Sequence, residues 1–259
     1  MIFFTIFTCD LTSQTTNTPA NAKESKYADD LFLWKTSTNI TTLQAQLTTA
    51  CSNLKEWSQK WRINFSTVKT EAMVFKKGAT PTISIKFGNE TLKTVQEKRI
   101  LGITVDNKLK FQPHISKIAA QAKNSANVIS QLRQLNVKSC INIYKAFSQS
   151  RLMYGSLIIW EHALNSYGNF PTLLSAQHHG LRKIIQATPS TATSTLQAEL
   201  QIPPVDLQVN DLVRREYAKI MSKTDTDPTK SLIESKAVKN KAKLSPVDFI
   251  SEKGKELEK

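Results

Sequence analysis

The sequence predicts an α+β protein in which a strand-rich part precedes a helical part. Up to about residue 106, short apolar runs are separated by turn residues, which is typical of strands and hairpins. From 107 to about 222, apolar residues recur every three or four positions, which indicates helices. Hydrophobic residues form 40% and charged residues 22% of the chain, as in folded globular proteins. We therefore expect three regions, at 1–106, 107–222 and 223–259, the last a charged flexible tail.

The first region begins with a short helix and a hairpin. Residues 1–11 are expected to form the end of a buried helix, and the polar stretch 12–25 a loop. Ser25–Trp34 predicts a β-hairpin with an acidic pair at its turn. Capping side chains at 37–39 introduce a helix that runs to about Lys60. Its apolar positions recur at helical spacing: Leu43, Leu47, Ala50, Cys51, Leu54, Trp57 and Trp61.

Short strands follow this helix. Ala72–Phe75 predicts one strand. Apolar residues alternate over Ile83–Phe87 and are followed by Gly88-Asn89, which predicts a second hairpin. Arg99–Val105 predicts a further single strand, in which Gly102 allows another part of the backbone to approach closely.

The second region predicts a series of helices. One apolar stripe consists of Ile115, Ile118, Ala122, Ile129 and Leu132. A second helix is expected over Ser139–Leu152, with Tyr144 and the pair Ile143 and Phe147 packed inward. Further helices are expected at Leu173–Ile185 and Leu207–Met221.

Positive charge is concentrated in the helical region. The net charge of +14 favours an anionic partner, and nucleic acid is the commonest such partner. From Asn107 to Trp160 the chain contains no Asp or Glu. We interpret this span as an electrostatic track for a phosphate backbone, with compositional drift as the alternative. Its candidate nucleic-acid-binding residues are Lys108, Lys110, Lys117, Lys123, Arg133, Lys138, Lys145 and Arg151.

The cysteines and apolar runs indicate the compartment. Cys9, Cys51 and Cys140 are too far apart for a disulfide scaffold or a zinc site, so a reducing compartment is expected. No apolar run approaches the ~20 residues that span a bilayer, so no membrane partner is expected. The apolar start at 1–7 lacks a basic leader and a small-residue cleavage site. We therefore expect an intracellular protein, nuclear or cytoplasmic, that is not secreted.

The acidic pair Asp29-Asp30 is the main candidate for chemistry. It lies between Tyr27-Ala28 and the apolar run 31–34. Mg²⁺ prefers hard oxygen ligands, often one or two carboxylates together with substrate phosphates. Such a pair suits phosphoryl transfer by two metal ions. The alternative interpretation is a solvated acidic turn.

The order of the motifs resembles the C-terminal part of a reverse transcriptase from a non-LTR, jockey-like retrotransposon. Lys26-Tyr-Ala-Asp-Asp30 resembles that family's catalytic hairpin, and Lys69-Thr-Glu71 resembles the next motif. Ile100–Asp106 resembles the primer-grip strand. Other matching segments are Phe4–Phe7 with Asp10-Leu11, Asn64, Lys110-Phe111, His114-Ile115, Tyr144-Lys145-Ala146, Arg151–Ser156 with Trp160, Gln177, Leu181-Arg182 and Ile202-Pro203. The resemblance covers about residues 3 to 222.

The resemblance implies roles for the hairpin residues. Asp29 would ligate metal directly, and Asp30 would contribute by ligation or through its field. Tyr27 and Ala28 would shape the turn. Lys69 would lie near the nucleotide phosphates, where its ammonium can offset negative charge or donate a proton. The implied cofactor is Mg²⁺, in a site for two ions roughly 3.5–4 Å apart.

The resemblance also implies an architecture and partners. Region 1–106 would be part of a polymerase palm, and region 107–222 its helical thumb. Leu101, Gly102 and Ile103 would form the primer grip. The partners would be an RNA template, a DNA primer and deoxynucleoside triphosphates, and the reaction would be attack of the primer 3′-hydroxyl on the α-phosphate.

One part of the family pattern is absent from the sequence. The family's first catalytic Asp and a Gln-Gly motif precede the hairpin, but Asp10 is the only Asp before Asp29, and it matches the preceding helix. The fingers are also absent. We therefore expect the isolated chain to be inactive or nearly so. The alternative function is a non-catalytic nucleic-acid-binding remnant of a mobile element.

Two other patterns have competing interpretations. Trp57 and Trp61 lie on an apolar stripe, so we expect them in the core rather than in a base-stacking platform. His178-His179 is a candidate metal pair, but no third ligand lies at a useful spacing, so we expect both on a helix surface.

Overall fold

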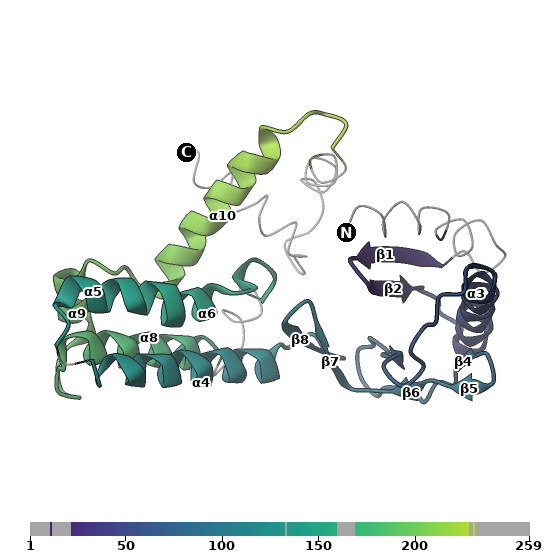
Figure 1. Cartoon of the computed structure of the whole chain (residues 1–259), viewed down its shortest axis with the longest axis horizontal. Coiled ribbons are helices and arrows are strands. Elements are labelled where there is room, and N and C mark those ends of the chain that lie inside the picture. Colours follow the sequence, from purple (N-terminus) through teal and green to yellow (C-terminus); the bar gives the residue numbers. More distant parts are fainter. Residues whose placement is uncertain (1–10, 12–21, 133, 160–168, 228–229, 231–259) are drawn as a thin grey trace. The chain divides into compact units, whose positions relative to one another are not determined.

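The computed structural model describes residues 11, 22–132, 134–159, 169–227 and 230. The chain forms two compact units, Met1–Lys98 and Arg99–Lys259, here called the hairpin unit and the helical unit (Figure 1). This boundary lies before the one suggested after Asp106. The described parts combine helices with small hairpins, compatible with the expected α+β class. The helix expected over 1–10, the loop over 12–21 and the tail beyond 230 lie outside the described residues.

The first hairpin forms as predicted, with one correction. Strands β1 (Lys23–Tyr27) and β2 (Asp30–Trp34) pair antiparallel, and Tyr27 lies opposite Asp30. Ala28 and Asp29 form the turn, and Ala28 has a φ of 52°, as tight hairpin turns require positive φ. Asp30 is therefore the first residue of β2, and only Asp29 lies within the turn.

Helix α3 (Ile40–Trp61) has well-defined ends. The Asn39 side chain accepts a hydrogen bond from the Thr42 amide at 3.2 Å, which confirms the predicted N-terminal cap. Arg62, with a φ of 56°, ends the helix. Trp57 is buried as expected, but Trp61 is 39% exposed and lies outside the core. The core residues of the hairpin unit around α3 are Leu11, Cys51, Leu54, Trp57, Ala72, Ile83, Ile85, Phe87 and Leu92.

Short strand pairs complete the hairpin unit. β4 (Lys86–Phe87) and β5 (Glu90–Thr91) pair antiparallel around Gly88-Asn89, which confirms the second hairpin. β3 (Glu71–Ala72) pairs parallel with β6 (Lys93–Thr94). The strand predicted at Ala72–Phe75 is thus shorter than expected and begins earlier.

The segment predicted as one strand at Arg99–Val105 is two strands. β7 (Glu97–Ile100) and β8 (Ile103–Asp106) form a two-stranded sheet. Leu101 and Gly102 lie between them with φ of 46° and 86°. Two successive residues in this left-handed region reverse the chain, so the strands form a hairpin. The prediction of a single continuous strand was wrong.

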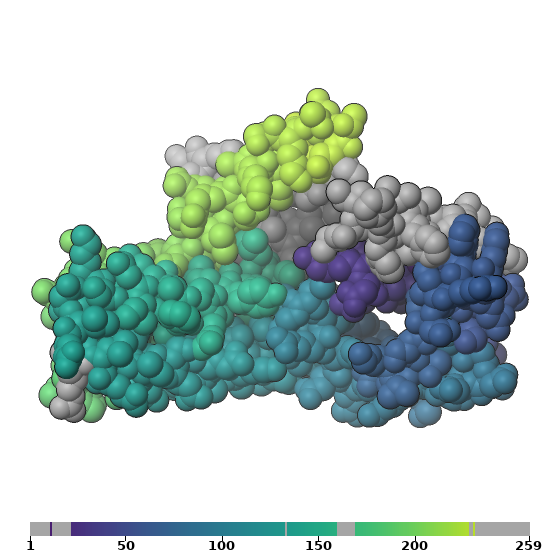
Figure 2. All heavy atoms as spheres, in the orientation of Figure 1, coloured from purple at the N-terminus to yellow at the C-terminus, as the bar shows by residue number. Residues whose placement is uncertain are grey.

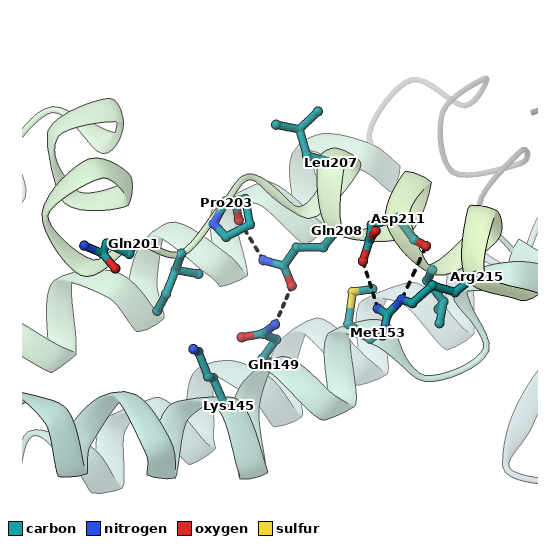
Figure 3. Close-up of a pocket in the computed structure, with 11 residues that line it drawn as sticks. Lys145, Gln149, Met153, Gln201, Pro203, Leu207, Gln208, Asp211 and Arg215 are labelled. Carbon is teal, nitrogen blue, oxygen red and sulfur yellow. Dashed lines mark hydrogen bonds and ion pairs between the residues drawn. The ribbon is translucent and has the colours of Figure 1, made fainter. Parts of the chain in front are cut away.

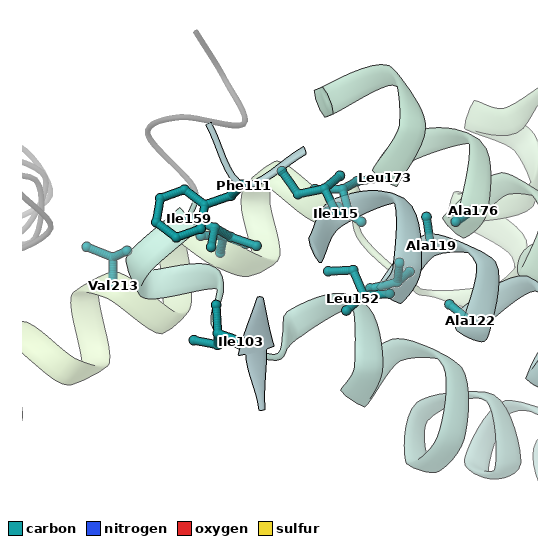
Figure 4. Packing of buried hydrophobic residues seen from close by; sticks show 13 residues of the cluster. Ile103, Phe111, Ile115, Ala119, Ala122, Leu152, Ile159, Leu173, Ala176 and Val213 are labelled. Carbon is teal, nitrogen blue, oxygen red and sulfur yellow. The ribbon is translucent and has the colours of Figure 1, made fainter. Parts of the chain in front are cut away.

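The core of the helical unit lies where α4 packs on α8 (Figure 4). α4 (Gln112–Ile129) buries the predicted stripe, except for Leu132, which follows the helix and is 36% exposed. α8 (Asn169–Ile185) and α10 (Val205–Met221) confirm the two later helices. The intervening α9 (Thr193–Leu200) was not predicted. Buried core residues include Ile103, Phe111, Ile115, Ile118, Ala119, Leu152, Ile159, Leu173, Ala176, Val209 and Val213.

The helix expected at Ser139–Leu152 contains a π-helical turn. It consists of α5 (Val137–Ile143), the π-helix η1 (Tyr144–Gln149) and α6 (Ser150–Met153). Tyr144 is fully buried, whereas Phe147 is 56% exposed. A π turn contains more residues than an α-helical turn. A side chain four residues after an inward-facing one, as Phe147 is after Ile143, therefore no longer faces the core. The prediction that Phe147 packs inward was therefore wrong.

Candidate functional site

Both predicted carboxylates lie at the tip of the first hairpin. Asp29 and Asp30 are exposed, and both line a small pocket of about 30 Å³. This volume is of the order that one or two water-sized ligands occupy. The pocket is lined by Leu11, Lys26, Ala28, Asp29, Asp30, Leu31, Trp57, Ile63 and Phe65. The hairpin therefore brings two carboxylates together above an apolar floor that α3 contributes to.

The donor chemistry of this tip fits Mg²⁺, but the number of donors is small. Two carboxylates are the hard oxygen ligands that Mg²⁺ takes. Within the described ranges, no group of three or more His, Cys, Asp or Glu side chains is arranged to hold a metal. Two ions would therefore need further oxygen donors from substrate, water or another carboxylate.

The residues beside the pair define the shape of the tip. Tyr27 closes the strand ladder opposite Asp30 and is 63% exposed. Ala28 supplies the left-handed backbone of the turn. Because five residue pairs hold β1 to β2, the two carboxylates are presented on a regular hairpin rather than on a loose loop.

Lys69 lies in a polar turn elsewhere in the hairpin unit. It is exposed and does not line the pocket beside Asp29 and Asp30. The Lys98 ammonium donates to the Lys69 carbonyl at 3.2 Å and pairs with Glu71 at 2.5 Å. Lys98 thus fixes the backbone of the Lys69-Thr70-Glu71 motif. No local pattern in the sequence marks this contact, because Lys98 is 27 residues from Glu71.

The three predicted primer-grip residues form the turn between β7 and β8. Leu101 is 44% exposed, and Ile103 is buried in the core of the helical unit. The Tyr154 hydroxyl donates to the Leu101 carbonyl at 2.6 Å. A Cβ on Gly102 would lie 2.7 Å from the Tyr154 oxygen. The close approach expected at Gly102 is therefore made by the Tyr154 side chain, which was not predicted.

His114 makes a second polar contact to the same hairpin. The Thr104 amide donates to Nδ1 of the buried His114 ring at 3.3 Å. Burial lowers the pKa of His114, and the charges of Lys117 and Arg99 lower it further, whereas the Tyr154 backbone acts in the opposite direction. The imidazole is therefore neutral at pH 7 and accepts through Nδ1.

The predicted basic residues begin in a structured loop before α4. The Asp106 carboxylate accepts hydrogen bonds from the amides of Lys108, Lys110 and Phe111 at 3.2, 3.1 and 2.6 Å. This fixes the loop and leaves both lysine side chains exposed. Lys117 is also exposed, one turn into α4.

Two of the predicted basic residues make contacts on opposite sides of α4: Lys123 lies on one side of the helix, and Arg151 binds the other. Lys123 donates to Ser175 of α8 at 3.1 Å. The Arg151 guanidinium contacts the Gln121 carbonyl at 3.2 Å and the Ser125 hydroxyl. Since each residue turns the helix by about 100°, positions 121 and 123 face nearly opposite directions. Lys138 is exposed on α5, and Arg133 lies outside the described residues. These hydrogen bonds do not link the basic side chains into one continuous positively charged surface.

Several curated proteins are similar to most of this chain. Jockey RNA-directed DNA polymerases from Drosophila melanogaster and Drosophila funebris are each 24% identical, over 221 and 226 residues. The chain is similar to jockey-type reverse transcriptases. A probable RNA-directed DNA polymerase from transposon BS of Drosophila melanogaster is also 24% identical, over 237 residues. The matches cover 82–85% of this chain but only 24–25% of each relative.

The similarity to jockey-type reverse transcriptases confirms the resemblance expected from the motifs. The chain spans about a quarter of the length of the curated relatives it matches. No family model matches the chain, and no solved structure matches it. Among the described helices, none is sufficiently long and apolar to cross a membrane.

A groove lies within the helical unit, between η1–α6 and α10 (Figure 3). It has a volume of about 430 Å³, and Lys145 lines it. Gln149 donates to Gln208 at 2.5 Å, and Gln208 donates to the Pro203 carbonyl at 2.7 Å. The Arg215 guanidinium at its edge pairs with Asp211 at 3.1 Å. Figure 2 shows α10, in yellow-green, beside these teal helices.

The histidine pair in α8 is half-buried. His179 Nε2 lies 2.7 Å from the Asn127 side-chain oxygen. Burial lowers the pKa of both histidines, and the charge of Arg182 adds to this effect. The described residues around the pair include no third metal ligand. The structure therefore favours the prediction that His178 and His179 lie on a helix surface over a metal site, although neither side chain is fully exposed.

Proposed function

We propose that this chain supplies part of the palm and the helical thumb of an RNA-directed DNA polymerase from a jockey-type mobile element. The observation that carries the proposal is the exposed Asp29-Asp30 pair at the tip of a regular hairpin. Its support is the similarity to jockey polymerases over more than four-fifths of the chain. The helical unit would then hold the nucleic acid.

Each part of the hairpin unit has a defined task in this proposal. Asp29 and Asp30 would hold Mg²⁺, which supplies positive charge against the reacting phosphates when bound. Tyr27 and Ala28 hold both carboxylates at the tip through the turn geometry. Lys69 would neutralise charge on the nucleotide phosphates, on a backbone that Lys98 fixes.

The proposed partners are an RNA template, a DNA primer and deoxynucleoside triphosphates. Exposed Lys108, Lys110, Lys117 and Lys138 would contact backbone phosphates. Lys123 and Arg151 would contribute chiefly by fixing α4. An intracellular location is part of the proposal, and the free, buried Cys51 and Cys140 agree with it.

The isolated chain is proposed to be inactive or nearly so. Its hairpin offers two carboxylates, and no third acidic ligand joins them within the described residues. Two carboxylates do not complete a site for two cations. Primer extension by the purified 259-residue chain with Mg²⁺ would contradict this part of the proposal.

A chimera tests the catalytic role of the pair. The region of the jockey polymerase that precedes the matched part would be fused to this chain and assayed for primer extension on an RNA template. We expect extension by the chimera, and a loss on the order of 100-fold or more for Asp29→Asn. Glu90→Gln, at an exposed acid of the second hairpin, is the matched control and should change the rate less than about twofold. Equal rates for Asp29→Asn and Glu90→Gln would refute the role of Asp29.

A second candidate function is nucleic-acid binding without catalysis. The small number of acidic donors, together with exposed lysines on an acid-free span, favours it. It predicts salt-dependent binding to a primer–template duplex that survives Asp29→Asn and Asp30→Asn, and a chimera that does not extend primers. Each lost phosphate contact should reduce the salt slope by about 1.

A further inference from the structure

Tyr154 attaches the β7–β8 turn to the end of α6. Its hydroxyl donates to the Leu101 carbonyl at 2.6 Å, 53 residues away in the chain. α6 ends at Met153, and Tyr154 has an extended backbone with a ψ of 122°. The side chain is 49% exposed. The turn is therefore held from outside its own hairpin by a residue that remains accessible to a ligand.

Two glycines allow this close packing. A Cβ on Gly102 would lie 2.7 Å from the Tyr154 hydroxyl oxygen, and one on Gly155 would lie 2.8 Å from Ile103 Cδ1. Both glycines have positive φ, at 86° and 74°. The Tyr154-Gly155 corner and the Gly102-Ile103 corner thus fit each other without room for an added methyl group.

A second contact holds the start of β8, next to the turn. The Thr104 amide donates to His114 of α4 at 3.3 Å. The hairpin therefore has polar contacts to His114 of α4 and to Tyr154, directly after α6. The boundary between the two units also falls before Arg99, so the turn belongs to the helical unit.

We propose that Tyr154 is a positioning residue, whose hydroxyl fixes the Leu101–Gly102 turn so that the turn can hold the 3′ end of a primer. This inference rests on the proposed function, which places a primer end at Leu101, Gly102 and Ile103. Without the hydroxyl, Leu101 and Gly102 keep their sequence but lose the contact that fixes their left-handed backbone. The exposed ring of Tyr154 remains beside the turn in either case.

The test compares two duplexes bound to the full 259-residue chain. One carries a recessed primer 3′ end on a template overhang, and the other is blunt with the same number of phosphates. Fluorescence anisotropy gives both Kd values, and their ratio measures preference for the 3′ end. We expect the wild-type chain to prefer the recessed end, and Tyr154→Phe to reduce that preference about three- to tenfold, the range expected for one hydrogen bond.

A matched control separates the hydroxyl contact from a general effect of removing a tyrosine hydroxyl. Tyr144→Phe makes the same chemical change at a buried hydroxyl for which the structure shows no hydrogen-bond partner. This control should leave the 3′-end preference and the blunt-duplex affinity within about twofold of the wild type. Tyr154→Phe should also leave the blunt-duplex affinity unchanged, since Lys108, Lys110 and Lys117 remain.

Hydrogen exchange without nucleic acid gives a readout that a direct ligand role would not change. Amides of residues 99–106 should exchange faster in Tyr154→Phe and at the wild-type rate in Tyr144→Phe. Unchanged exchange would overturn the inference, even if the 3′-end preference fell, because Tyr154 would then act as a direct contact. Equal wild-type affinity for both duplexes would also overturn it. A wild-type chain that binds neither duplex would instead refute the proposed function, and the exchange data would still decide whether Tyr154 fixes the turn.

Discussion

The turns after β1 and after β7 both begin with a left-handed residue but differ in what stabilises them. Ala28 and Leu101 each begin a two-residue turn with a left-handed φ, of 52° and 46°. The first turn lies at the end of a ladder of five residue pairs. The second joins shorter strands and is held by Tyr154, directly after α6, and by His114 of α4. The first turn is defined by its own strands and is a local structure. The Leu101–Gly102 turn, here called the clamped turn, depends on the integrity of the helical unit.

The largest effect is expected from Gly102→Ala in the clamped turn. The new methyl group meets the Tyr154 hydroxyl, and the residue has a φ of 86°. We expect the helical unit to lose about 2–3 kcal/mol of stability, measured by denaturant unfolding followed by far-UV circular dichroism. Gly78→Ala is the matched control, since its φ of 84° is similar but a Cβ added there would meet no atom within 4 Å. Gly78→Ala should cost the hairpin unit, in which Gly78 lies, only about 1 kcal/mol. Equal losses of stability in the two variants would show that Tyr154 does not constrain the clamped turn.

Ala28→Gly should have a smaller effect, of opposite sign, in the other turn. Glycine adopts the left-handed region without the steric cost that alanine carries, but it loses more entropy on folding. The hairpin unit should gain about 0.5–1 kcal/mol, measured by unfolding followed by tryptophan fluorescence, because Trp57 is buried beside this turn. A loss of stability would indicate that the methyl group of Ala28 packs into the pocket below.

Acidification should weaken the clamped turn selectively. The pKa of His114 is lowered in the folded protein by burial and by the charges of Lys117 and Arg99, so the unfolded chain binds the proton more readily. The stability of the helical unit should be complete above about pH 6.5, the unfolded value, and should fall as the pH drops toward the lower folded value. The effect should be modest, because one side chain carries it.

His114→Asn provides the control for this pH dependence. Its side-chain oxygen can accept from the Thr104 amide, but it does not titrate. Unfolding measured from pH 8 to 5 should show a shallower loss in this variant, while His178 and His179 continue to contribute in both proteins. An identical pH profile would exclude His114 as the source.

The smallest effect is expected at Lys98 in the hairpin unit. Its ion pair with Glu71 is partly exposed, so Lys98→Met should cost about 0.5 kcal/mol, less at 1 M salt. Lys93→Met on the exposed strand β6 is the matched control. If Lys98 fixes the Lys69 backbone, exchange of the amides at 69–71 should also increase, and only in Lys98→Met. Unchanged exchange would contradict that role.

The difference between local and long-range contacts also explains which features could be predicted from the sequence. The hairpin around Asp29, the cap at Asn39 and the turn at Gly88-Asn89 arise from neighbouring residues, and all were predicted. The division of Arg99–Val105 into two strands was missed, because Leu101 rarely takes a left-handed φ without tertiary support.

The remaining errors have the same physical origin. The exposure of Phe147 follows from a π turn that apolar periodicity does not encode. The roles of Lys98, Tyr154 and His114 depend on contacts across 27, 53 and 10 residues, which no local pattern marks. Of the candidate site, the sequence predicted the two carboxylates at the tip of the first hairpin, but neither the turn at Leu101–Gly102 nor the side chains that hold it in place.

Asp106 has a consequence for how a polyanion would meet the helical unit. It is the last acidic residue before the acid-free span, and Lys108 and Lys110 follow it closely. Its carboxylate oxygens are occupied by three backbone amides of the same loop. A phosphate that approaches this loop therefore meets two exposed ammonium groups, while the adjacent negative charge is already compensated by the main chain.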